Sequence, residues 1–229
     1  MGTITTFKRY ELKYIITTEQ RTAMLELFKE HMVPDSYGAY TIFNLYFDTP
    51  DYLLIRRSIE KPVYKEKLRA RSYGQIDHNE NVFLELKKKY KRQVYKRRIV
   101  LEEEQMTEYF TENHNLPDNQ ISKEIDYFRS IYDQIAPRIF IAYDRIAFFG
   151  KDRDDLRITF DESILWRNDN LSLCSGKYGK KILNDNEVLM EIKVVGGMPL
   201  WLTHFLTEQK IYKTSFSKYG NAYKQLMSS

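Results

Sequence analysis

The stretch YKEKLRARSYG, from Tyr64 to Gly74, carries a cation at every second position from 65 to 71. The four cations are Lys65, Lys67, Arg69 and Arg71. Successive side chains of a β-strand point to opposite faces, so an extended chain places all four cations on one face. Like charges at this spacing repel one another. This face therefore requires an opposite charge or an anionic ligand.

Alternation with a period of two recurs in six further segments, which we predict to be strands. They are Phe7–Ile16, Val82–Tyr90, Val94–Leu101, Arg138–Phe149, Leu156–Glu162 and Val188–Val195. The two segments that follow Gly74 add further cations to one face, namely Lys87, Lys89, Lys96 and Arg98. The few carboxylates on the charged faces are Glu11, Glu85, Asp161 and Glu191.

Five segments between the strands have the apolar spacing of amphipathic helices. They are Thr17–Met32, Thr49–Ile59, Ser122–Ile135, Met198–Gln209 and Ser217–Met227. Thr17 and Gln20 have the spacing of a capping box. Thr49 is expected as the N-cap of the second helix, with Pro50 in its first turn, where a missing N–H is tolerated.

Two arrangements of the strands are consistent with this pattern. An open antiparallel sheet would expose its charged face to water, whereas a closed barrel would turn the charged faces inward and place the apolar faces beneath helices. Solvated faces normally pair opposite charges across strands, so the excess of cations favours the barrel. We predict an α+β fold: one domain over residues 1–229, with an antiparallel β-barrel that forms a tunnel lined by basic residues and flanking helices.

The overall composition says little about partners, because 36 Lys and Arg face 32 Asp and Glu and the net charge is only +4. A basic face on a nearly neutral protein favours an oligophosphate-like ligand, and we find no nucleic-acid-binding motif. No apolar run approaches the roughly 20 residues of a membrane-spanning helix. We expect a cytoplasmic protein, in which a separate partner would supply any association with a membrane.

Nine short segments occur in an order that resembles the VTC domain, the polyphosphate polymerase module of the vacuolar transporter chaperone complex and its bacterial relatives. They are RYELKYII, LYFDT, KEKLRARSYG, FLELKKK, YKRR, YDRIAF, LRITFDE, VLMEIKV and SFSKYGNAY. The resemblance extends from about Phe7 to Leu226. This family belongs to the triphosphate tunnel metalloenzyme, or CYTH-like, superfamily, whose fold is a β-barrel tunnel with basic residues inside.

The resemblance implies that the chain binds ATP or another nucleoside triphosphate with Mn²⁺ or Mg²⁺ and transfers the terminal phosphoryl group to polyphosphate. By motif, the implied catalytic residues are Lys13, Arg69, Arg71 and Lys218. The expected phosphate-binding residues are Lys67, Lys87, Lys96, Arg98, Arg145, Arg157 and Lys193. The implied metal ligand is Glu191, with Glu11 and Glu85 as further candidates that could instead form structural salt bridges.

These residue types suit phosphoryl transfer, which depends mostly on alignment and electrostatic stabilisation. Arginine holds phosphate oxygens bidentately, and lysine supplies a mobile point charge. A carboxylate can hold Mg²⁺ or Mn²⁺ while phosphates and water complete the coordination shell. An acceptor phosphate is already ionised, so no dedicated general base is needed.

One departure from the superfamily pattern lies in the first strand. Hydrolytic members often begin with Glu-x-Glu-x-Lys, whereas this chain has Arg9 in place of the first glutamate, followed by Glu11 and Lys13. Exchanging a carboxylate for a cation favours binding of a second polyanion over activation of water by two metals. A tunnel triphosphatase and a non-catalytic polyanion-binding module remain as alternatives to the polymerase.

The remaining reactive side chains are few. The four histidines at positions 31, 78, 114 and 204 are scattered along the sequence, and we expect structural or surface roles for them. Cys174 is the only cysteine, which excludes an internal disulfide, and we expect it to be inert.

Overall fold

The computed structural model describes residues 9–91, 93–112 and 114–228. The chain divides into two compact units. The first consists of Met1–Tyr40, Tyr143–Ser163 and Leu183–Phe216, and the second of Thr41–Ala142, Ile164–Ile182 and Ser217–Ser229. The strands that contribute residues to both units are β2, β6 and β7.

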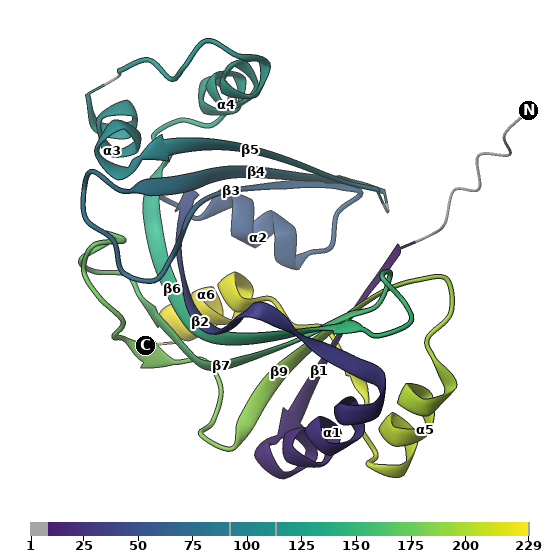
Figure 1. The fold of residues 1–229 in the computed structure, drawn as a ribbon. Helices are drawn as coiled ribbons and strands as arrows, with labels where there is room; N and C mark the ends of the chain where they lie inside the picture. The colour runs from purple at the N-terminus through teal and green to yellow at the C-terminus, as the bar shows by residue number, and fades with distance from the viewer. Residues whose placement is uncertain (1–8, 92, 113, 229) are drawn as a thin grey trace, which may run out of the picture. The chain divides into compact units, whose positions relative to one another are not determined.

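The described residues form ten strands and six helices (Figure 1). The strands are β1 (Arg9–Thr17), β2 (Met32–Asp48), β3 (Tyr64–Tyr73), β4 (Asn81–Tyr90), β5 (Gln93–Glu102), β6 (Ala136–Gly150), β7 (Arg157–Arg167), β8 (Lys180–Lys181), β9 (Glu187–Val195) and β10 (Lys213–Thr214). The helices are α1 (Thr18–His31), α2 (Leu53–Ile59), α3 (Glu103–Thr111), α4 (Gln120–Ile131), α5 (Leu200–Glu208) and α6 (Lys218–Met227).

The strands belong to one sheet in the order β10-β1-β9-β7-β6-β2-β3-β4-β5, with β8 paired to β7. The α+β class and the antiparallel pairing expected from the sequence are confirmed. The sheet is not closed, whereas we expected a closed barrel: within the described residues, no pairing joins the edge strands β10 and β5. A two-residue edge strand offers too few backbone groups to pair along the ten residues of β5.

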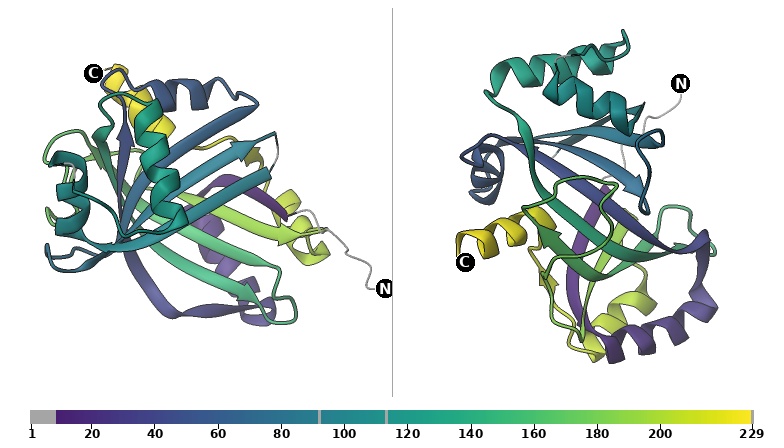
Figure 2. Two further views of the ribbon diagram at one scale, coloured as in Figure 1. Left: turned by 90° about the horizontal axis from the view of Figure 1, so that it is seen from above. Right: turned by 90° about the vertical axis from the view of Figure 1, so that its left-hand side faces the viewer.

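In the second unit, helices cover the apolar face of β3–β5. Figures 1 and 2 show α3 and α4 lying against β4 and β5. Leu84, Leu86 and Ile99 of the sheet share one core with Met106 of α3 and Phe128 of α4. Because side chains alternate along each strand, burial of this face leaves the cations on the opposite face.

The first unit repeats this arrangement with other elements. The alternate residues of β9 from Val188 to Val194 are buried. They share a core with Phe28 of α1 and with Leu202 and Leu206 of α5. The charged residues of β1 and β9 consequently lie on the face away from these helices.

All seven strands and all five helices expected from the sequence are present. The capping box of α1 is confirmed: Thr17 Oγ1 accepts from the backbone N–H of Gln20, and the Gln20 side chain accepts from the backbone N–H of Thr17. In the first expected strand, Phe7 and Lys8 lie outside the described residues. The helix expected at Ser122–Ile135 is α4, which begins earlier, at Gln120, and ends earlier, at Ile131. It begins earlier because the Asn119 side chain caps its N-terminus by accepting from the N–H of Ser122.

The expected start of α2 was wrong. Thr49 to Tyr52 form a turn, in which the N–H of Tyr52 donates to the carbonyl of Thr49 at 3.0 Å, and the helix begins at Leu53. The Thr49 hydroxyl still accepts from the N–H of Leu53 at 2.9 Å, so it satisfies a helical donor from outside the helix. We did not predict β2 as a strand from the sequence, because its residues from Ile42 to Asp48 are all buried and therefore do not alternate.

Asp48, the last residue of β2, connects α2 and α6 within the second unit. Its fully buried carboxylate accepts from the backbone N–H groups of Thr49, Leu54 and Ile55 at 2.9–3.0 Å. It also accepts from the hydroxyl of Tyr219 in α6 at 2.7 Å. One carboxylate thus fixes both helices, and α6 carries residues of the candidate site described below.

Replacing Asp48 by asparagine is expected to lower the free energy of unfolding by roughly 3 kcal/mol or more, because an amide cannot accept all four hydrogen bonds and charge-assisted bonds are the strong ones. The matched control is Asp51→Asn, which removes an exposed carboxylate that is ion-paired with Arg56 and should change stability by about 1 kcal/mol at most. Urea denaturation of both variants measures the difference, and equal effects would contradict the role given to Asp48.

Candidate functional site

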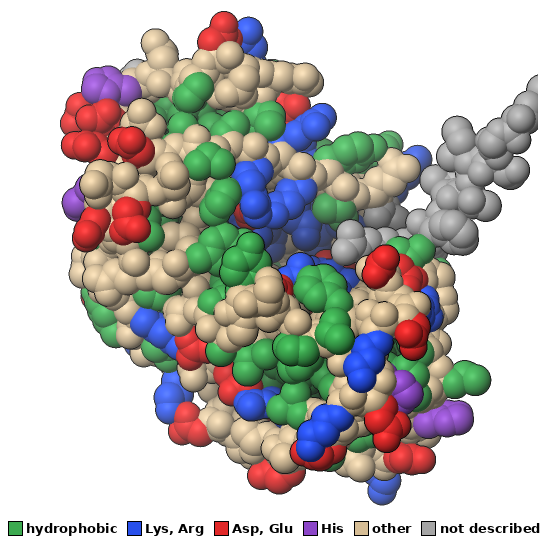
Figure 3. Space-filling model, in the orientation of Figure 1, with side chains coloured by type: hydrophobic (Ala, Val, Ile, Leu, Met, Phe, Trp, Pro, Cys, Tyr) green, Lys and Arg blue, Asp and Glu red, His purple; other side chains and the backbone are tan. Residues whose placement is uncertain are grey.

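The charged face of β3–β5 places like charges directly opposite one another. In the register of these strands, Lys67 lies opposite Lys87, and Lys87 lies opposite Lys96. One pair further along, Arg69 lies opposite Glu85, and Glu85 opposite Arg98. Cβ atoms of directly opposed residues are about 4.5–5.5 Å apart, and like charges at this separation destabilise a sheet. Figure 3 shows Lys and Arg side chains gathered around these strands.

Glu85 is the counter-charge of this face. Its carboxylate is 1 % exposed and accepts from Arg69 Nε at 2.7 Å, from Arg98 Nε at 2.8 Å and from Lys96 Nζ at 2.6 Å. Burial alone would raise the pKa of Glu85, but Arg69, Arg71 and Lys96 outweigh it and hold the pKa far below its usual value. Of the two alternatives left open for Glu85, its contacts are those of a salt bridge that orients two arginines.

The cations around Glu85 are crowded. Burial, followed by the neighbouring lysines at 89 and 87, lowers the pKa of Lys65. Burial also lowers the pKa of Lys96, although its hydrogen bond to Glu85 opposes the shift. Eight cations share the face of β3–β5 with two carboxylates, Glu85 and Glu102. Glu102 is the last residue of β5 and the N-cap of α3. The face therefore carries a strong local excess of positive charge.

The N-terminus of α6 lies beside this face. Lys67 Nζ donates to Ser217 Oγ at 3.4 Å and lies 5.8 Å from the ring centre of Tyr219. Lys218, between these two residues, is buried, with 8 % of its surface exposed. Tyr219 stacks on Tyr46 of β2, and the Tyr46 hydroxyl accepts from Arg69 at 3.4 Å. Lys67 thus contacts the two residues that flank Lys218, and Arg69 contacts Tyr46, on which Tyr219 stacks.

Arg71 is held by β2 rather than by an acid. Its guanidinium is buried, and Nε donates to Asn44 Oδ1 at 3.1 Å, while the Asn44 amide donates to the carbonyl of Ile141 at 3.2 Å. Asn44, Tyr46 and Asp48 were all missed by the sequence analysis. Their signal is faint, because they alternate along a strand whose two faces are both buried.

The first unit carries a second charged face, on β1, β9 and β7, in which opposite charges alternate. Lys13 lies opposite Glu191, and Glu191 opposite Thr159. The neighbouring row contains Glu11, Lys193 and Arg157. This face is a mixed one, in contrast to the cationic face of the second unit.

Lys13 is the centre of the mixed face. Its ammonium group lies 3.2 Å from Glu191 Oε1 and 3.7 Å from Glu11 Oε1, and it donates to the carbonyl of Phe216 at 3.1 Å. Burial lowers the pKa of Lys193, with Glu191 and Glu11 opposing the shift. The predicted residues Lys13, Glu191 and Lys193 thus lie together.

The two predicted arginines of this unit have different environments. Arg145 forms a bidentate ion pair with the fully buried Asp161, at 2.5 and 2.7 Å. Arg157 lies 3.5 Å from Asp35, and its guanidinium lies 4.9 Å from the ring centre of Phe149. Arg145 is therefore bound within the protein, whereas Arg157 is held less tightly.

Two buried polar atoms on the mixed face have no hydrogen-bond partner within the described residues, Arg157 Nε and Thr159 Oγ1. Buried polar groups normally have partners, so such atoms call for an explanation. The carboxylates of Glu191 and Glu11 and the Thr159 hydroxyl are hard oxygen donors, which suit Mg²⁺ or Mn²⁺. The donor set of this face therefore fits a divalent metal.

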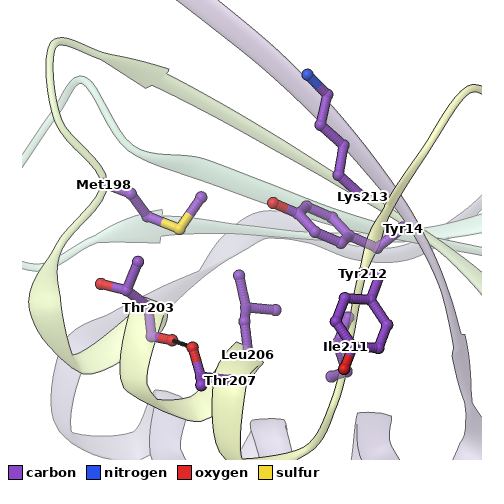
Figure 4. A pocket seen from close by; sticks show the side chains of 8 residues that line it. All are labelled: Tyr14, Met198, Thr203, Leu206, Thr207, Ile211, Tyr212 and Lys213. Atoms are coloured by element: carbon purple, nitrogen blue, oxygen red, sulfur yellow. Dashed lines mark hydrogen bonds between the residues drawn. The ribbon is translucent and has the colours of Figure 1, made fainter.

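A cavity of about 280 Å³ lies elsewhere in the first unit (Figure 4). It is lined by Tyr14, Met198, Thr203, Leu206, Thr207, Ile211, Tyr212 and Lys213. None of the site residues predicted from the sequence lines it. Its mostly apolar wall does not suit a polyanion.

A comparison with protein families matches the VTC domain over residues 8–227. The chain belongs to the VTC domain family. The match covers residues of both compact units of this VTC chain. A comparison with curated proteins gives no match.

Solved structures similar to this VTC chain include a provisionally assigned adenylate cyclase from Bacillus halodurans, with 13 % identity and a TM-score of 0.56 over 90 % of this chain and 92 % of that one. Another is an adenylyl cyclase candidate from Hippeastrum, described as having a dominant triphosphatase activity, with 16 % identity and a TM-score of 0.55 over 95 % and 96 %. At these identities the likeness shows the fold alone, which is the CYTH-like fold expected from the sequence.

The low pKa of Glu85 predicts how stability depends on pH. Because the pKa is lower in the folded chain than the usual 4.5, the contribution of Glu85 is fully present above this value and is lost as the pH falls below it. Between about pH 6 and about pH 3, the wild type should lose roughly 2 kcal/mol more of its unfolding free energy than Glu85→Gln. Urea denaturation at both pH values measures this, with the exposed Glu26→Gln as control. The same loss in wild type and Glu85→Gln would show that Glu85 is not the linked group.

Proposed function

We propose that the chain is a polyphosphate polymerase, which transfers the terminal phosphoryl group of ATP to a polyphosphate chain with the help of Mn²⁺ or Mg²⁺. Membership of the VTC domain family supports this proposal. We further propose that residues 1–229 act as one domain, since the family match extends over both units.

The observation that carries the proposal is the row of Lys67, Lys87 and Lys96 on three adjacent strands. Such a row destabilises the folded chain unless an anion lies against it. Glu85 lies in the neighbouring row and pairs with Lys96 at 2.6 Å, so one carboxylate offsets only part of the charge of both rows. A flexible chain of phosphates has one or more negative charges on every unit, which makes it a suitable ligand for a row of cations.

The arginines suit the fixed parts of this ligand. Arg69 and Arg98 are held in place by Glu85, and Arg71 by Asn44, so their guanidinium groups are oriented before a ligand arrives. A pre-oriented guanidinium binds phosphate oxygens with less loss of side-chain freedom than a mobile ammonium group. We propose that these arginines position the phosphates and that the lysines compensate their charge.

The mixed face of the first unit is the proposed place for the metal. Glu191, together with Glu11, would hold the ion, and Lys13 and Lys193 would bind phosphate oxygens beside it. The bound ion would neutralise charge on the transferring phosphoryl group. The acceptor is ionised, so none of these residues needs to remove a proton.

A tunnel triphosphatase is the second candidate, and a specific observation favours it. Glu11 and Glu191 both lie within 4 Å of Lys13 Nζ, so two carboxylates lie beside one another even though Arg9 stands in place of the first glutamate. The structure from Hippeastrum is described as that of a protein with triphosphatase activity. The two candidates differ in the acceptor, which is phosphate in one and water in the other.

As for membranes, none of the helices within residues 9–91, 93–112 and 114–228 combines the length and apolarity needed to span a bilayer. We propose that the protein works in the cytoplasm and that a separate partner would supply any attachment to a membrane.

The cationic face can be tested by binding. Lys87→Ala is expected to weaken the binding of tripolyphosphate about three- to tenfold, because a cation on the ligand-facing side is lost. Lys88→Ala is the matched control, since Lys88 points to the opposite face of the same strand and pairs with Glu124 of α4. Isothermal titration calorimetry measures both affinities. Equal losses in the two variants would show that the face is not the binding surface.

The reaction can be tested by its products. The purified chain with ATP and Mn²⁺ or Mg²⁺ should form long phosphate chains, visible by gel electrophoresis and ³¹P NMR. Glu191→Gln should reduce the rate by about 100-fold or more, because the metal supplies several kcal/mol of charge stabilisation. Glu187→Gln, with the same charge change on the same strand, is the control and should retain the rate.

The products also separate the alternatives. Release of orthophosphate from tripolyphosphate without longer chains would assign the triphosphatase instead. Tight binding of polyphosphate that survives metal chelation, with no turnover of either substrate, would leave only a binding module.

A further inference from the structure

Three side chains of types that often ligate metals come from distant parts of the sequence and meet in the second unit. His78 lies between β3 and β4, Glu103 is the first residue of α3, and Cys174 lies between β7 and β8. One ligand atom from each lies within 4.8 Å of the others. Neither charged face described above contains any of these residues.

The contacts of His78 exclude a catalytic triad. His78 Nδ1 lies 2.6 Å from Glu103 Oε2 and 3.8 Å from Cys174 Sγ. A nucleophilic triad needs the acid on one ring nitrogen and the nucleophile on the other, so that the imidazole can pass a proton. Here the same nitrogen makes both contacts. Burial also raises the pKa of the Cys174 thiol, whereas an activated nucleophile has a lowered pKa.

The same geometry is close to that of a metal site. Ligands of tetrahedral Zn²⁺ lie about 2.0–2.3 Å from the ion, which separates them by roughly 3.3–3.8 Å. The distance of 3.8 Å between sulfur and nitrogen already agrees with this range. The nitrogen and oxygen atoms at 2.6 Å must move apart by roughly 1 Å, and the His78 side chain, which is 70 % exposed, has room to do so.

Hydrogen bonds to the backbone carbonyls of His78 and Cys174 hold the three segments in place. The N–H of Glu104 donates to the carbonyl of His78 at 2.9 Å, and the Gln75 side chain donates to the carbonyl of Cys174 at 3.0 Å. Ile76, two positions before His78, and Leu173, directly before Cys174, are both buried in the core of the second unit. The three ligands therefore come from segments that are already fixed relative to one another.

The surroundings are negatively charged. Glu103, Asp77 and Glu80 interact electrostatically with the Cys174 thiol, and Glu104 and Asp77 do so with His78. These acids favour a cation and disfavour an anionic ligand. The cluster thus has the opposite charge from the phosphate-binding face proposed for the same unit.

We propose that His78, Glu103 and Cys174 form a binding site for Zn²⁺ or a similar borderline-soft divalent cation. Thiolate and imidazole ligands select such ions over Mg²⁺ and Mn²⁺, which prefer oxygen. Three protein ligands leave a fourth position for water, because His78 faces solvent. Binding forms bonds from the metal to sulfur, nitrogen and oxygen, and the thiol proton leaves to the buffer. The ion would join the β3–β4 loop, α3 and the β7–β8 loop.

The test is titration of the purified, metal-free chain with Co²⁺, followed by absorption spectroscopy. Cys174 is the only cysteine in the chain, so a thiolate-to-cobalt charge-transfer band can arise from this residue alone. We expect one Co²⁺ per chain with this band and with the intense visible bands of tetrahedral coordination. Zn²⁺ should displace Co²⁺ and remove both.

Three variants test the ligand set. Cys174→Ser should abolish the charge-transfer band, and His78→Ala and Glu103→Gln should each weaken Co²⁺ binding by at least about tenfold. His114→Ala is the matched control, because His114 forms a similar pair with Glu108 at 2.9 Å without a cysteine nearby, and it should leave the spectrum unchanged. The absence of a thiolate band in the wild type, or a band that survives His78→Ala with unchanged affinity, would overturn the proposal.

A second readout is independent of spectroscopy. Zn²⁺ at about 100 times its dissociation constant should raise the Tm of the wild type by roughly 5–10 °C, and this shift should be lost in Cys174→Ser. Neither readout involves ATP or polyphosphate, so a failure here would leave the proposed function untouched. The same Tm shift in Cys174→Ser as in the wild type would place the zinc elsewhere and overturn the proposal.

Discussion

Repulsion between cations on one face of β3–β5 is the constraint on which the site depends. Lys67, Lys87 and Lys96 lie directly opposite one another across three strands, and only the neighbouring row contains a buried carboxylate, Glu85. The folded chain tolerates this arrangement because the other face of the same strands is a continuous core beneath α3 and α4. The free energy gained by burying that core offsets the electrostatic cost of placing eight cations beside two carboxylates.

The two units use the same construction for different chemistry. In each, helices pack on the apolar face of antiparallel strands. The charged face of the second unit is contacted by α2 and by the start of α6, through Lys65 and Lys67. In the second unit the charged face is cationic, with arginines oriented by Glu85 and Asn44. In the first unit Lys13 lies between Glu11 and Glu191, so carboxylates and cations alternate. A cationic face suits phosphate, and a face with carboxylates suits a metal ion.

Period-two alternation did not identify most of the residues that hold the site residues in place. Period-two alternation located Lys67, Arg69, Lys87 and Arg98, because a strand with one buried face must alternate. It could not locate Asn44, Tyr46 and Asp48, because the second half of β2 is buried on both faces. Nor could it place His78 beside Cys174, which is 96 positions away in the chain. Such contacts depend on strand order and loop paths, which local periodicity does not encode.

The sequence by itself determined seven of the ten described strands, which face of each of the seven is charged and, through the order of its motifs, the family. These follow from local chemistry, since alternation along an extended chain fixes the side on which each side chain lies. Only the tertiary structure decided the register between strands, and with it the pairing of Glu85 with Arg69, Arg98 and Lys96. It also decided that the sheet ends at β5 and β10 without closing. Pairing and closure depend on how distant segments meet, and a shift of one residue would have turned every cation to the opposite face.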